Sequence, residues 1–243
     1  MKTIAAIGAL SLALLATTAA GTLSAAAPPS TAPAAPTDRI TWVGRVLAPV
    51  TARRSPTRTG KAITVVQPIA PLGRGATVRQ VTGARRDGDG RLWVRAKLPI
   101  RPNEVQGWIP ADVMRFNTTP MRIRIDLSAL RLDLFANGRR VMRVPVAVGT
   151  PQNPTPTGHF AIAEMIRTRT EGAFLGPIVF PMTAYSETLS DFAGGNGRAA
   201  IHGTSVPSSV GTRASHGCVR LLNRDIVRVA RRVRPGTPVD IVP

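Results

Sequence analysis

The sequence holds one cysteine, Cys218, and two of its three histidines precede it closely. His216 lies two residues before the thiol, and His202 lies in the preceding segment, next to a glycine. The thiolate is the nucleophilic form of cysteine, so a cysteine that attacks an acyl carbon needs a lowered pKa or a base beside it. An imidazole is the side chain that most often supplies this base. The residue types therefore predict acyl-group chemistry at Cys218, with both histidines as candidate bases.

Gly217, between the second histidine and the cysteine, fits the same chemistry. A glycine lets the backbone approach a substrate closely, and successive N–H groups at Gly217 and Cys218 can point at one oxygen, as an oxyanion hole requires. If this segment is extended, the side chains of His216 and Cys218 lie on the same face. A lone cysteine is usually a small buried hydrophobic residue. That interpretation leaves the clustering of two histidines and their glycines around the thiol unexplained.

Two elements are expected to position these groups, a strand before His202 and a helix after Cys218. The apolar run 199–201 predicts a strand that ends at His202 and turns at Gly203, so that the ring projects from a sheet edge. Asn223 is the predicted N-cap of the helix, and the Pro-Gly pair at 235–236 ends it. The apolar stripe of this helix comprises Ile226, Val229, Ala230 and Val233.

The rest of residues 121–243 has the pattern of β-structure. The predicted strands are 122–127, 131–135, 140–148, 159–164 and 178–185. Asn137-Gly138 predicts a two-residue hairpin turn between the second and third of these strands, because both residues accept positive φ. This part of the chain is therefore expected to be mainly β, with one C-terminal helix.

Residues 40–116 contain short apolar runs separated by turn-forming residues, which is typical of a small all-β barrel. The predicted strands are 62–66, 77–82, 92–96 and 106–109. Trp93 lies in the third run and Trp108 in the fourth, and this pair of tryptophan strands resembles the end of a bacterial SH3-like domain. The resemblance implies an SH3-like domain over residues 39–117, with both tryptophans in its core.

The first residues are expected to be a targeting segment and not part of the fold. Residues 1–27 combine an N-terminal lysine, an apolar run and small residues at candidate cleavage sites, which is the pattern of a secretory signal peptide. A membrane anchor is the alternative, but the apolar run has about the minimum length for a span and is rich in alanine. Residues 28–38, rich in alanine and proline, predict a linker. The mature chain is thus expected to be secreted into the cell envelope, with no stable membrane span.

The formal net charge of +19 favours an anionic partner. Nucleic acid is a poor candidate, because aromatic residues make up only 4% of the sequence and export is expected. Anionic wall polymers, or peptidoglycan with its free carboxylates, fit an exported protein better, although an arginine-rich solvated surface explains the charge equally well. A single cysteine excludes an internal disulfide and a thiolate zinc site. No metal and no other cofactor is expected.

Two pairs of motifs resemble one family. The segments 202–204 (His-Gly-Thr) and 215–220 (Ser-His-Gly-Cys-Val-Arg) are similar to the signature of the L,D-transpeptidase (YkuD-type) catalytic domain. Upstream, 146–149 (Val-Ala-Val-Gly) and 155–160 (Thr-Pro-Thr-Gly-His-Phe) resemble a hairpin of the same family. The resemblance covers about residues 121–243 and implies a β-sandwich or mixed β domain.

The resemblance implies a peptide-bond exchange in the bacterial cell wall. The cysteine attacks the carbonyl after the third residue of a tetrapeptide stem, expels the terminal D-alanine and keeps the stem as a thioester. An amine of a neighbouring stem then resolves the thioester to a 3→3 cross-link. On this pattern Cys218 is the nucleophile, His202 the general base, and His216 a residue that shapes the site and handles protons. The backbone amides of 216–218, Gly217 among them, would form the oxyanion hole.

Four further residues are implied to bind substrate or to support the site. They are Gly203, Ser215, Arg220 and Tyr185. A backbone carbonyl near Gly203 would orient the base, and a structural hydrogen bond is favoured for Ser215. Arg220 would pair with a substrate carboxylate or brace its loop, and Tyr185 would line the acceptor cleft.

Three alternatives remain beside the transpeptidase. An L,D-carboxypeptidase would let water resolve the same thioester, and the sequence does not separate the two reactions. A papain-like endopeptidase of the wall usually places its cysteine before its histidine, whereas His202 precedes Cys218 here. A non-catalytic wall-binding protein would use only the SH3-like domain, but the presence of the cysteine and both histidines argues against it.

Overall fold

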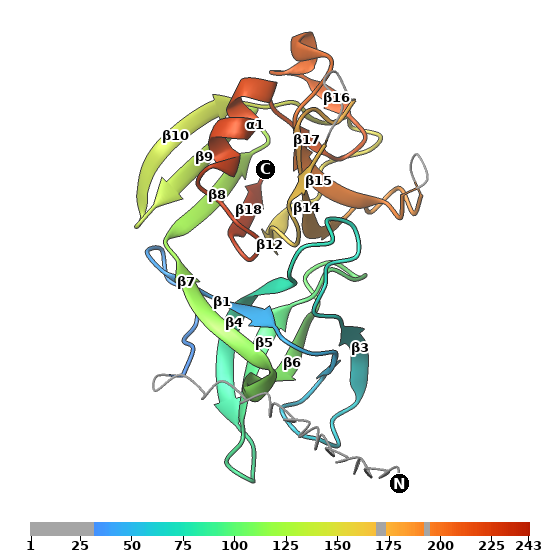
Figure 1. The fold of residues 1–243 in the computed structure, drawn as a ribbon. Helices are drawn as coiled ribbons and strands as arrows, with labels where there is room; N and C mark the ends of the chain where they lie inside the picture. Colours follow the sequence, from blue (N-terminus) through green and yellow to red (C-terminus); the bar gives the residue numbers. More distant parts are fainter. Residues whose placement is uncertain (1–31, 169–173, 192–194) are drawn as a thin grey trace, which may run out of the picture.

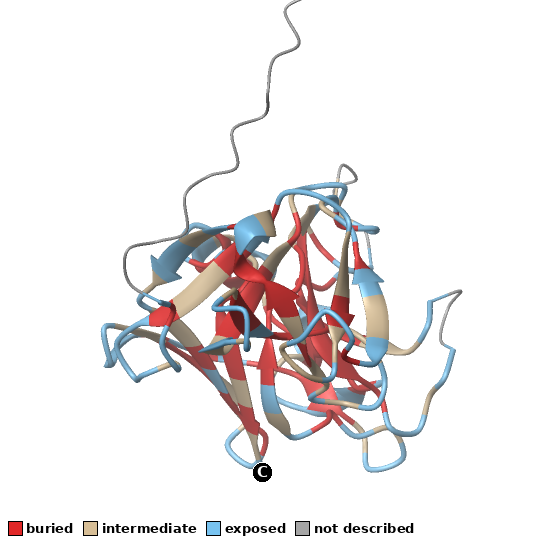
Figure 2. Ribbon diagram, turned by 90° about the horizontal axis from the view of Figure 1, so that it is seen from below, coloured by how far each residue is buried: buried red, intermediate tan, exposed pale blue. Residues whose placement is uncertain are grey.

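The computed structural model describes residues 32–168, 174–191 and 195–243, so the predicted signal peptide (1–27) and the first residues of the predicted linker lie outside the described residues. The described chain has two hydrophobic cores. Figure 1 shows the two parts of the chain that contain them, and Figure 2 shows the buried residues in red. One is built from side chains of residues 42–116, and the other from side chains of residues 121–241. We call the parts around these cores the N-terminal module (41–119) and the C-terminal module (121–242).

The N-terminal module is built from seven antiparallel strands. They are β1 (Thr41–Val46), β2 (Val50–Arg53), β3 (Ala62–Val66), β4 (Val78–Arg86), β5 (Leu92–Lys97), β6 (Gln106–Pro110) and β7 (Met114–Thr119), with the short 3-10 helix η1 (Ala111–Val113) before β7. Their order in the sheet is β3-β2-β6-β5-β4-β1-β7. The strands predicted at 62–66, 92–96 and 106–109 are confirmed, and β4 extends the strand predicted at 77–82. β7 was not predicted, because this edge strand buries few of its side chains and its sequence has no clear alternation.

The two tryptophans of this module have different environments. Trp93 is buried, and its indole Nε1 donates a hydrogen bond to Asp87 Oδ2 at 2.7 Å. Trp108 is half-buried on β6. The predicted core position is therefore right for Trp93 and only partly right for Trp108.

The C-terminal module has two larger sheets and one small one. The five-stranded sheet, in the order β10-β9-β8-β18-β12, contains β8 (Met121–Asp126), β9 (Arg131–Ala136), β10 (Arg139–Pro145), β12 (Gly158–Ala161) and β18 (Pro238–Val242). The four-stranded sheet, in the order β13-β14-β15-β17, contains β13 (Ile166–Arg167), β14 (Ile178–Tyr185), β15 (Arg198–His202) and β17 (Val219–Arg220). A parallel pair joins β11 (Val148–Gly149) to β16 (Arg213–Ser215), which follows the 3-10 helix η2 (Pro207–Ser209).

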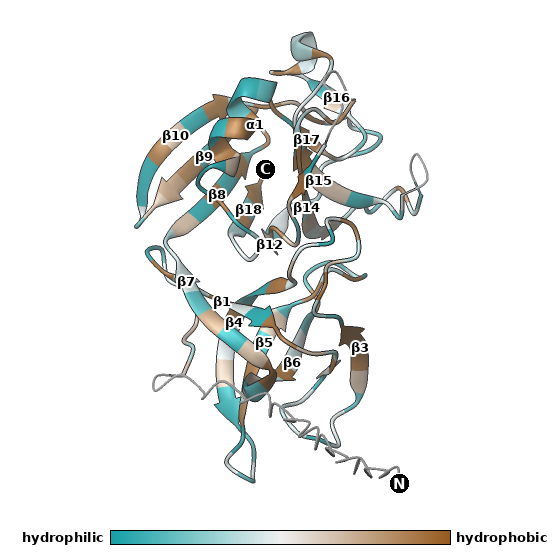
Figure 3. Ribbon diagram, viewed as in Figure 1, coloured by the Kyte–Doolittle hydropathy of each residue, from teal (hydrophilic) through white to brown (hydrophobic). Residues whose placement is uncertain are grey.

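The core of the C-terminal module lies between the two larger sheets. Ile123 and Leu132 reach it from the five-stranded sheet, and Phe180 and Ile201 from the four-stranded sheet; all four are fully buried. On β10, Val144 faces this core while its neighbour Arg143 is exposed, so the hydropathy alternates along the strand (Figure 3). The predicted fold class, mainly β with one C-terminal helix, is confirmed within the described residues.

The hairpin predicted at Asn137-Gly138 is present. Both residues have positive φ, 51° and 77°, and the flanking Ala136 and Arg139 are paired. Two residues of positive φ match the right-handed twist of the strands that they connect. This turn therefore sets the register of β9 on β10.

The helix α1 (Asn223–Ala230) is the predicted C-terminal helix, and it buries Ile226 and Val229 against the core. The prediction of Asn223 as its N-cap is wrong. Leu222 occupies the N-cap position, and the Asn223 side-chain oxygen accepts a hydrogen bond from the backbone N–H of Thr204 at 2.9 Å. Asn223 therefore fixes the turn that follows His202.

The two modules are joined by hydrogen bonds from the loop between β5 and β6. Asn103 bonds to both the backbone O and the backbone N of Tyr185, at 2.9 and 2.8 Å. The Tyr185 hydroxyl donates to the carbonyl of Pro99 at 2.7 Å, and Glu104 accepts the N–H of His159 at 2.6 Å. These contacts hold the end of β14 against the N-terminal module. In the described part of the chain, no helix has the length and hydropathy that a bilayer span needs.

Candidate active site

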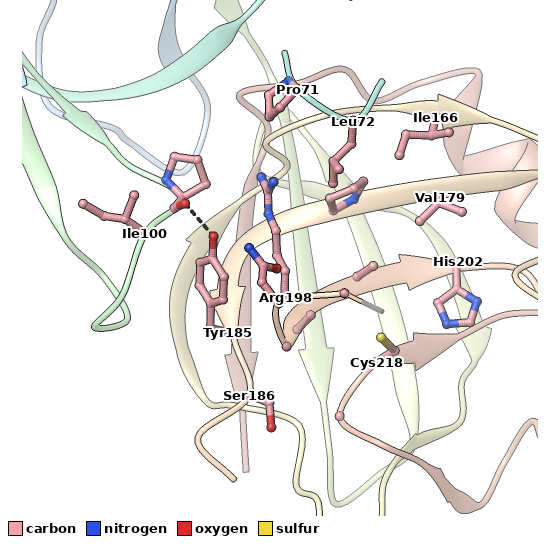
Figure 4. A pocket seen from close by; sticks show the side chains of 18 of the residues that line it. Pro71, Leu72, Ile100, Ile166, Val179, Tyr185, Ser186, Arg198, His202 and Cys218 are labelled. Atoms are coloured by element: carbon pink, nitrogen blue, oxygen red, sulfur yellow. Dashed lines mark hydrogen bonds between the residues drawn. The ribbon is translucent and has the colours of Figure 1, made fainter. Parts of the chain in front are cut away.

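Two neighbouring parallel strands bring the cysteine and the buried histidine together. β15 ends at His202, and β17, directly after Cys218, pairs with it so that Ile201 lies opposite Val219. In this register Cys218 lies beside the last residues of β15. Figure 4 shows the sulfur of Cys218 next to the imidazole ring of His202. The sequence motif therefore becomes a thiol–imidazole pair on a rigid sheet.

His202 is held by the backbone of the residue that follows it. Its side chain is buried, and its Nδ1 lies 2.5 Å from the carbonyl oxygen of Gly203. A carbonyl oxygen can only accept, so Nδ1 carries the proton and Nε2 is the basic nitrogen of the neutral ring. A side chain at position 203 would have its Cβ 2.3 Å from Asn223 Oδ1, so a glycine is required there.

The electrostatic environment keeps both groups neutral. Burial lowers the pKa of His202 to about 4, and the nearby Arg220 cation acts in the same direction. Burial also raises the pKa of the Cys218 thiol, although a hydrogen bond with the Ala200 backbone and the charge of Arg220 oppose that rise. Near neutral pH the pair is therefore a thiol beside a neutral imidazole. Such a pair requires proton transfer during attack on the substrate, because no thiolate is formed in advance.

Alkylation of Cys218 by iodoacetamide is a direct readout of this state. Because burial raises the thiol pKa above its ordinary value of 9.0, the alkylation rate is expected to keep rising with pH through pH 9. The rate is followed by the mass of the protein at a series of pH values, with free cysteine as the control. A plateau at pH 6–7 would show a preformed thiolate–imidazolium pair and contradict this account.

Ser215 and Gly217 shape the turn that carries the cysteine. The buried Ser215 hydroxyl donates to the Cys218 carbonyl at 2.5 Å and accepts the Gly217 N–H at 3.2 Å. Gly217 has φ +106°, a conformation that favours glycine. The segment is thus a turn, and the extended arrangement considered for 216–218 is wrong. The Gly217 N–H donates to the Ser215 hydroxyl here, and its place in an oxyanion hole stays a prediction.

The other candidate residues divide into those on the cleft and those behind it. His216 is exposed and lines the cleft, as does Arg220, whose buried guanidinium lies 5.1 Å from the centre of the Phe174 ring. Tyr185 lines the cleft and also joins the modules through its hydroxyl. Ser215 and Gly203 are not among the described residues that line it. Both act on the site through the hydrogen bonds that were expected of them: the Gly203 carbonyl orients His202, and the Ser215 hydroxyl holds the turn at Cys218.

The thiol opens into a cleft of about 960 Å³ that both modules line (Figure 4). Its catalytic end contains His202, His216 and Cys218. At the other end, the N-terminal module contributes mostly apolar side chains, among which Val65 and Leu72 are more than half exposed. This second wall was not predicted from the sequence, because it depends on how the two modules pack. The described residues contain no group of three or more His, Cys, Asp and Glu side chains placed to hold a metal ion.

Comparison with known proteins agrees with the motifs. A sequence model of the L,D-transpeptidase catalytic domain, named YkuD, matches residues 120–241. The YkuD protein of Bacillus licheniformis, whose name assigns it to the L,D-transpeptidases, is 38% identical over 127 residues, which are 52% of this chain and 68% of that protein. The corresponding protein of Bacillus subtilis is 37% identical over 124 residues, 51% of this chain and 67% of that protein.

Among solved structures, L,D-transpeptidase 3 from Mycobacterium tuberculosis is similar with a TM-score of 0.45 and 12% identity, over 82% of this chain and 95% of that one. The family match contains the thiol, both histidines of the cleft and the strands that position them. The N-terminal module lies outside this match.

Proposed function

Because the chain belongs to the L,D-transpeptidase (YkuD) family, we propose that it forms 3→3 cross-links between peptidoglycan stem peptides through a thioester on Cys218. The observation that carries the proposal is the Cys218 thiol beside the neutral imidazole of His202, at one end of a cleft large enough for a peptide. Peptidoglycan stems are the substrate class on which an L,D-transpeptidase catalytic domain acts. We propose accordingly that the protein acts in the cell envelope, after export directed by residues 1–27.

The proposed first step is acylation of the thiol. Nε2 of His202 takes the proton of the Cys218 thiol as the sulfur attacks the carbonyl after the third residue of the donor stem. The bond to the terminal D-alanine breaks, and the imidazolium returns the proton to the leaving amine. A thioester of the tripeptide stem remains. The backbone amides of residues 216–218, Gly217 among them, are the proposed donors to the oxyanion.

The proposed second step is transfer to an amine. The side-chain amine of a neighbouring stem attacks the thioester carbonyl, and His202 accepts its proton. The carbon–sulfur bond breaks, and the proton passes to the sulfur to restore the thiol. The thioester conserves the energy of the broken peptide bond for the new one, so no ATP is needed outside the membrane.

Purified tetrapeptide muropeptides test the reaction outcome. A transpeptidase is expected to give tripeptide-linked dimers together with free D-alanine, separated by chromatography and identified by mass. Tripeptide monomers with no dimer, at any concentration of acceptor stem, would mean that water resolves the thioester and that the chain is an L,D-carboxypeptidase. No change in the stems would leave only the wall-binding alternative. For the N-terminal module, we propose that it is an SH3-like domain and that it binds anionic wall polymers.

A further inference from the structure

Three buried polar atoms on the far wall of the cleft have no hydrogen-bond partner among the described residues. They are Thr77 Oγ1, Arg79 Nε and Arg198 Nη2. All three residues line the same cleft as Cys218. Two come from the N-terminal module, where Thr77 directly precedes β4, and the third begins β15 of the C-terminal module. A buried polar group normally has a partner, so the three atoms on this wall, with Arg220 Nε as a fourth such atom in the cleft, indicate a ligand.

Arg79 is the most unusual of the three. It is 6% exposed, and its guanidinium Nη1 makes long hydrogen bonds of 3.4 Å to the carbonyl oxygens of Val78 and Ala163. Among the described residues, no carboxylate lies within 4.0 Å of its guanidinium. Burial and the nearby Arg198 cation together lower the pKa of Arg79 to about 10, although the charge of Glu164 opposes them. Burying a cation is unfavourable unless an anion and hydrogen bonds accompany it.

Arg198 shows why the neighbouring carboxylate does not fill this role. Arg198 Nη1 is 3.0 Å from Glu164 Oε1, and its Nε donates to the Met182 carbonyl at 2.7 Å. The other oxygen of Glu164 accepts the N–H groups of Leu72 and Gly73 at 2.9 and 2.7 Å. Both carboxylate oxygens of Glu164 thus already accept hydrogen bonds, from one arginine and two backbone amides. One carboxylate then faces two guanidinium groups, which leaves an excess of one positive charge in a buried place.

The geometry of the wall suits a small planar anion. Thr77 and Arg79 are alternate residues of an extended segment, so their side chains lie on the same face. Figure 4 shows Arg198 between Tyr185 and Leu72, in the middle of the pocket. A hydroxyl and two guanidinium N–H groups can all donate to carboxylate oxygens, and guanidinium–carboxylate hydrogen bonds are among the strongest in proteins.

We propose that Thr77, Arg79 and Arg198 form a subsite for a free carboxylate of the stem peptide, so that the N-terminal module takes part in substrate recognition. The inference rests on the proposed function, because the cleft also holds the thiol that the peptide must reach. The stem carboxylate supplies the anion that Arg79 lacks. The donor stem and the acceptor stem both carry such a group, and the experiment separates them.

Binding is measured with the Cys218→Ala variant of the full chain, which holds the stem without turning it over. Tetrapeptide stems with free carboxylates are compared, by calorimetry, with stems in which one carboxylate at a time is amidated. Arg79→Gln is expected to raise the Kd of the free-acid stem about 10- to 100-fold, since a charged hydrogen bond is removed. One of the amidated stems is expected to bind Arg79→Gln and its parent equally. If Arg79 were only structural, its substitution would change the Kd of that amidated stem as well.

Arg85→Gln is the matched control, because Arg85 is an exposed arginine of the same strand. It is expected to leave every Kd unchanged. Thr77→Val keeps the side-chain shape and serves if Arg79→Gln unfolds; it is expected to weaken binding of the free-acid stem alone, several-fold. Unchanged affinity of the free-acid stem in both variants, or an equal loss with all stems, would overturn the proposal.

Turnover with the thiol intact identifies the stem concerned. If the donor carboxylate binds here, Arg79→Gln slows thioester formation. If the acceptor carboxylate binds here, the thioester forms at the parental rate and the yield of dimer falls. A parent protein that binds the stem but does not turn it over would contradict the proposed function. The Kd values of the free-acid and amidated stems would then still test the carboxylate subsite.

Discussion

Cys218→Ala is expected to abolish acyl transfer and to leave the fold intact. The substitution removes the sulfur that forms the thioester, and no other cysteine in the chain can replace it. Removing a nucleophile typically costs a factor of about 10⁴ or more in rate. The thiol is only partly buried, and its loss leaves the Ser215 hydrogen bonds to the Cys218 carbonyl and Gly217 in place, so the cost in stability is expected to be about 1 kcal/mol. Release of D-alanine and the thermal unfolding midpoint are measured together.

Cys218→Ser is the matched control for this prediction. It keeps the shape of the side chain and offers a hydroxyl whose pKa lies far above that of the thiol, so a trace of activity at most is expected. A folded Cys218→Ala protein that still releases D-alanine at a tenth of the parental rate would remove the thiol from the mechanism.

His202→Gln is expected to slow acylation by roughly 10²–10⁴-fold, which is the usual contribution of a general base. The thiol pKa is raised by burial, so without the imidazole almost no nucleophile forms near neutral pH. Glutamine can still donate to the carbonyl of Gly203, which preserves the local turn. The first-turnover rate of thioester formation is the quantity to compare.

His216→Gln is the control for the base, since that exposed histidine also lines the cleft. A smaller loss is expected from it. The difference in acylation rate between the parent and His202→Gln should also become smaller above pH 9, where hydroxide begins to deprotonate the thiol. Because the pKa of His202 lies near 4, the parent should keep its base unprotonated down to about pH 5. A larger loss from His216→Gln would mean that the base is assigned to the wrong histidine.

The local parts of the site were predictable from the sequence. The strands ending at Tyr185 and at His202 follow from continuous apolar runs, and the hairpin at 137–138 follows from two residues that accept positive φ. Each of these signals depends on neighbours in the chain. They predict the strand that ends at the base, but not the pairing of β15 with β17 that brings Cys218 beside it.

What the sequence did not predict depends on contacts between distant segments. Asn223 has the residue type of an N-cap, but its side chain bonds to Thr204, which lies in another loop. The N–H of Gly217 is bonded to Ser215 by a turn that the motif alone does not define. Arg79 is one of many arginines in a highly basic chain. Arg79 is buried beside the cleft only because the two modules pack together, and no local sequence pattern predicts that packing.

The central claim is that Cys218 carries the donor stem as a thioester, and peptide mass spectrometry of the acid-quenched protein tests it most directly. The protein is mixed with a tetrapeptide stem, quenched with acid and digested. The expected result is an added mass equal to the tripeptide acyl group on the peptide that contains Cys218, which disappears when an acceptor amine is supplied. Stem turnover with no adduct on that peptide, or an adduct that persists in Cys218→Ala, would contradict the account.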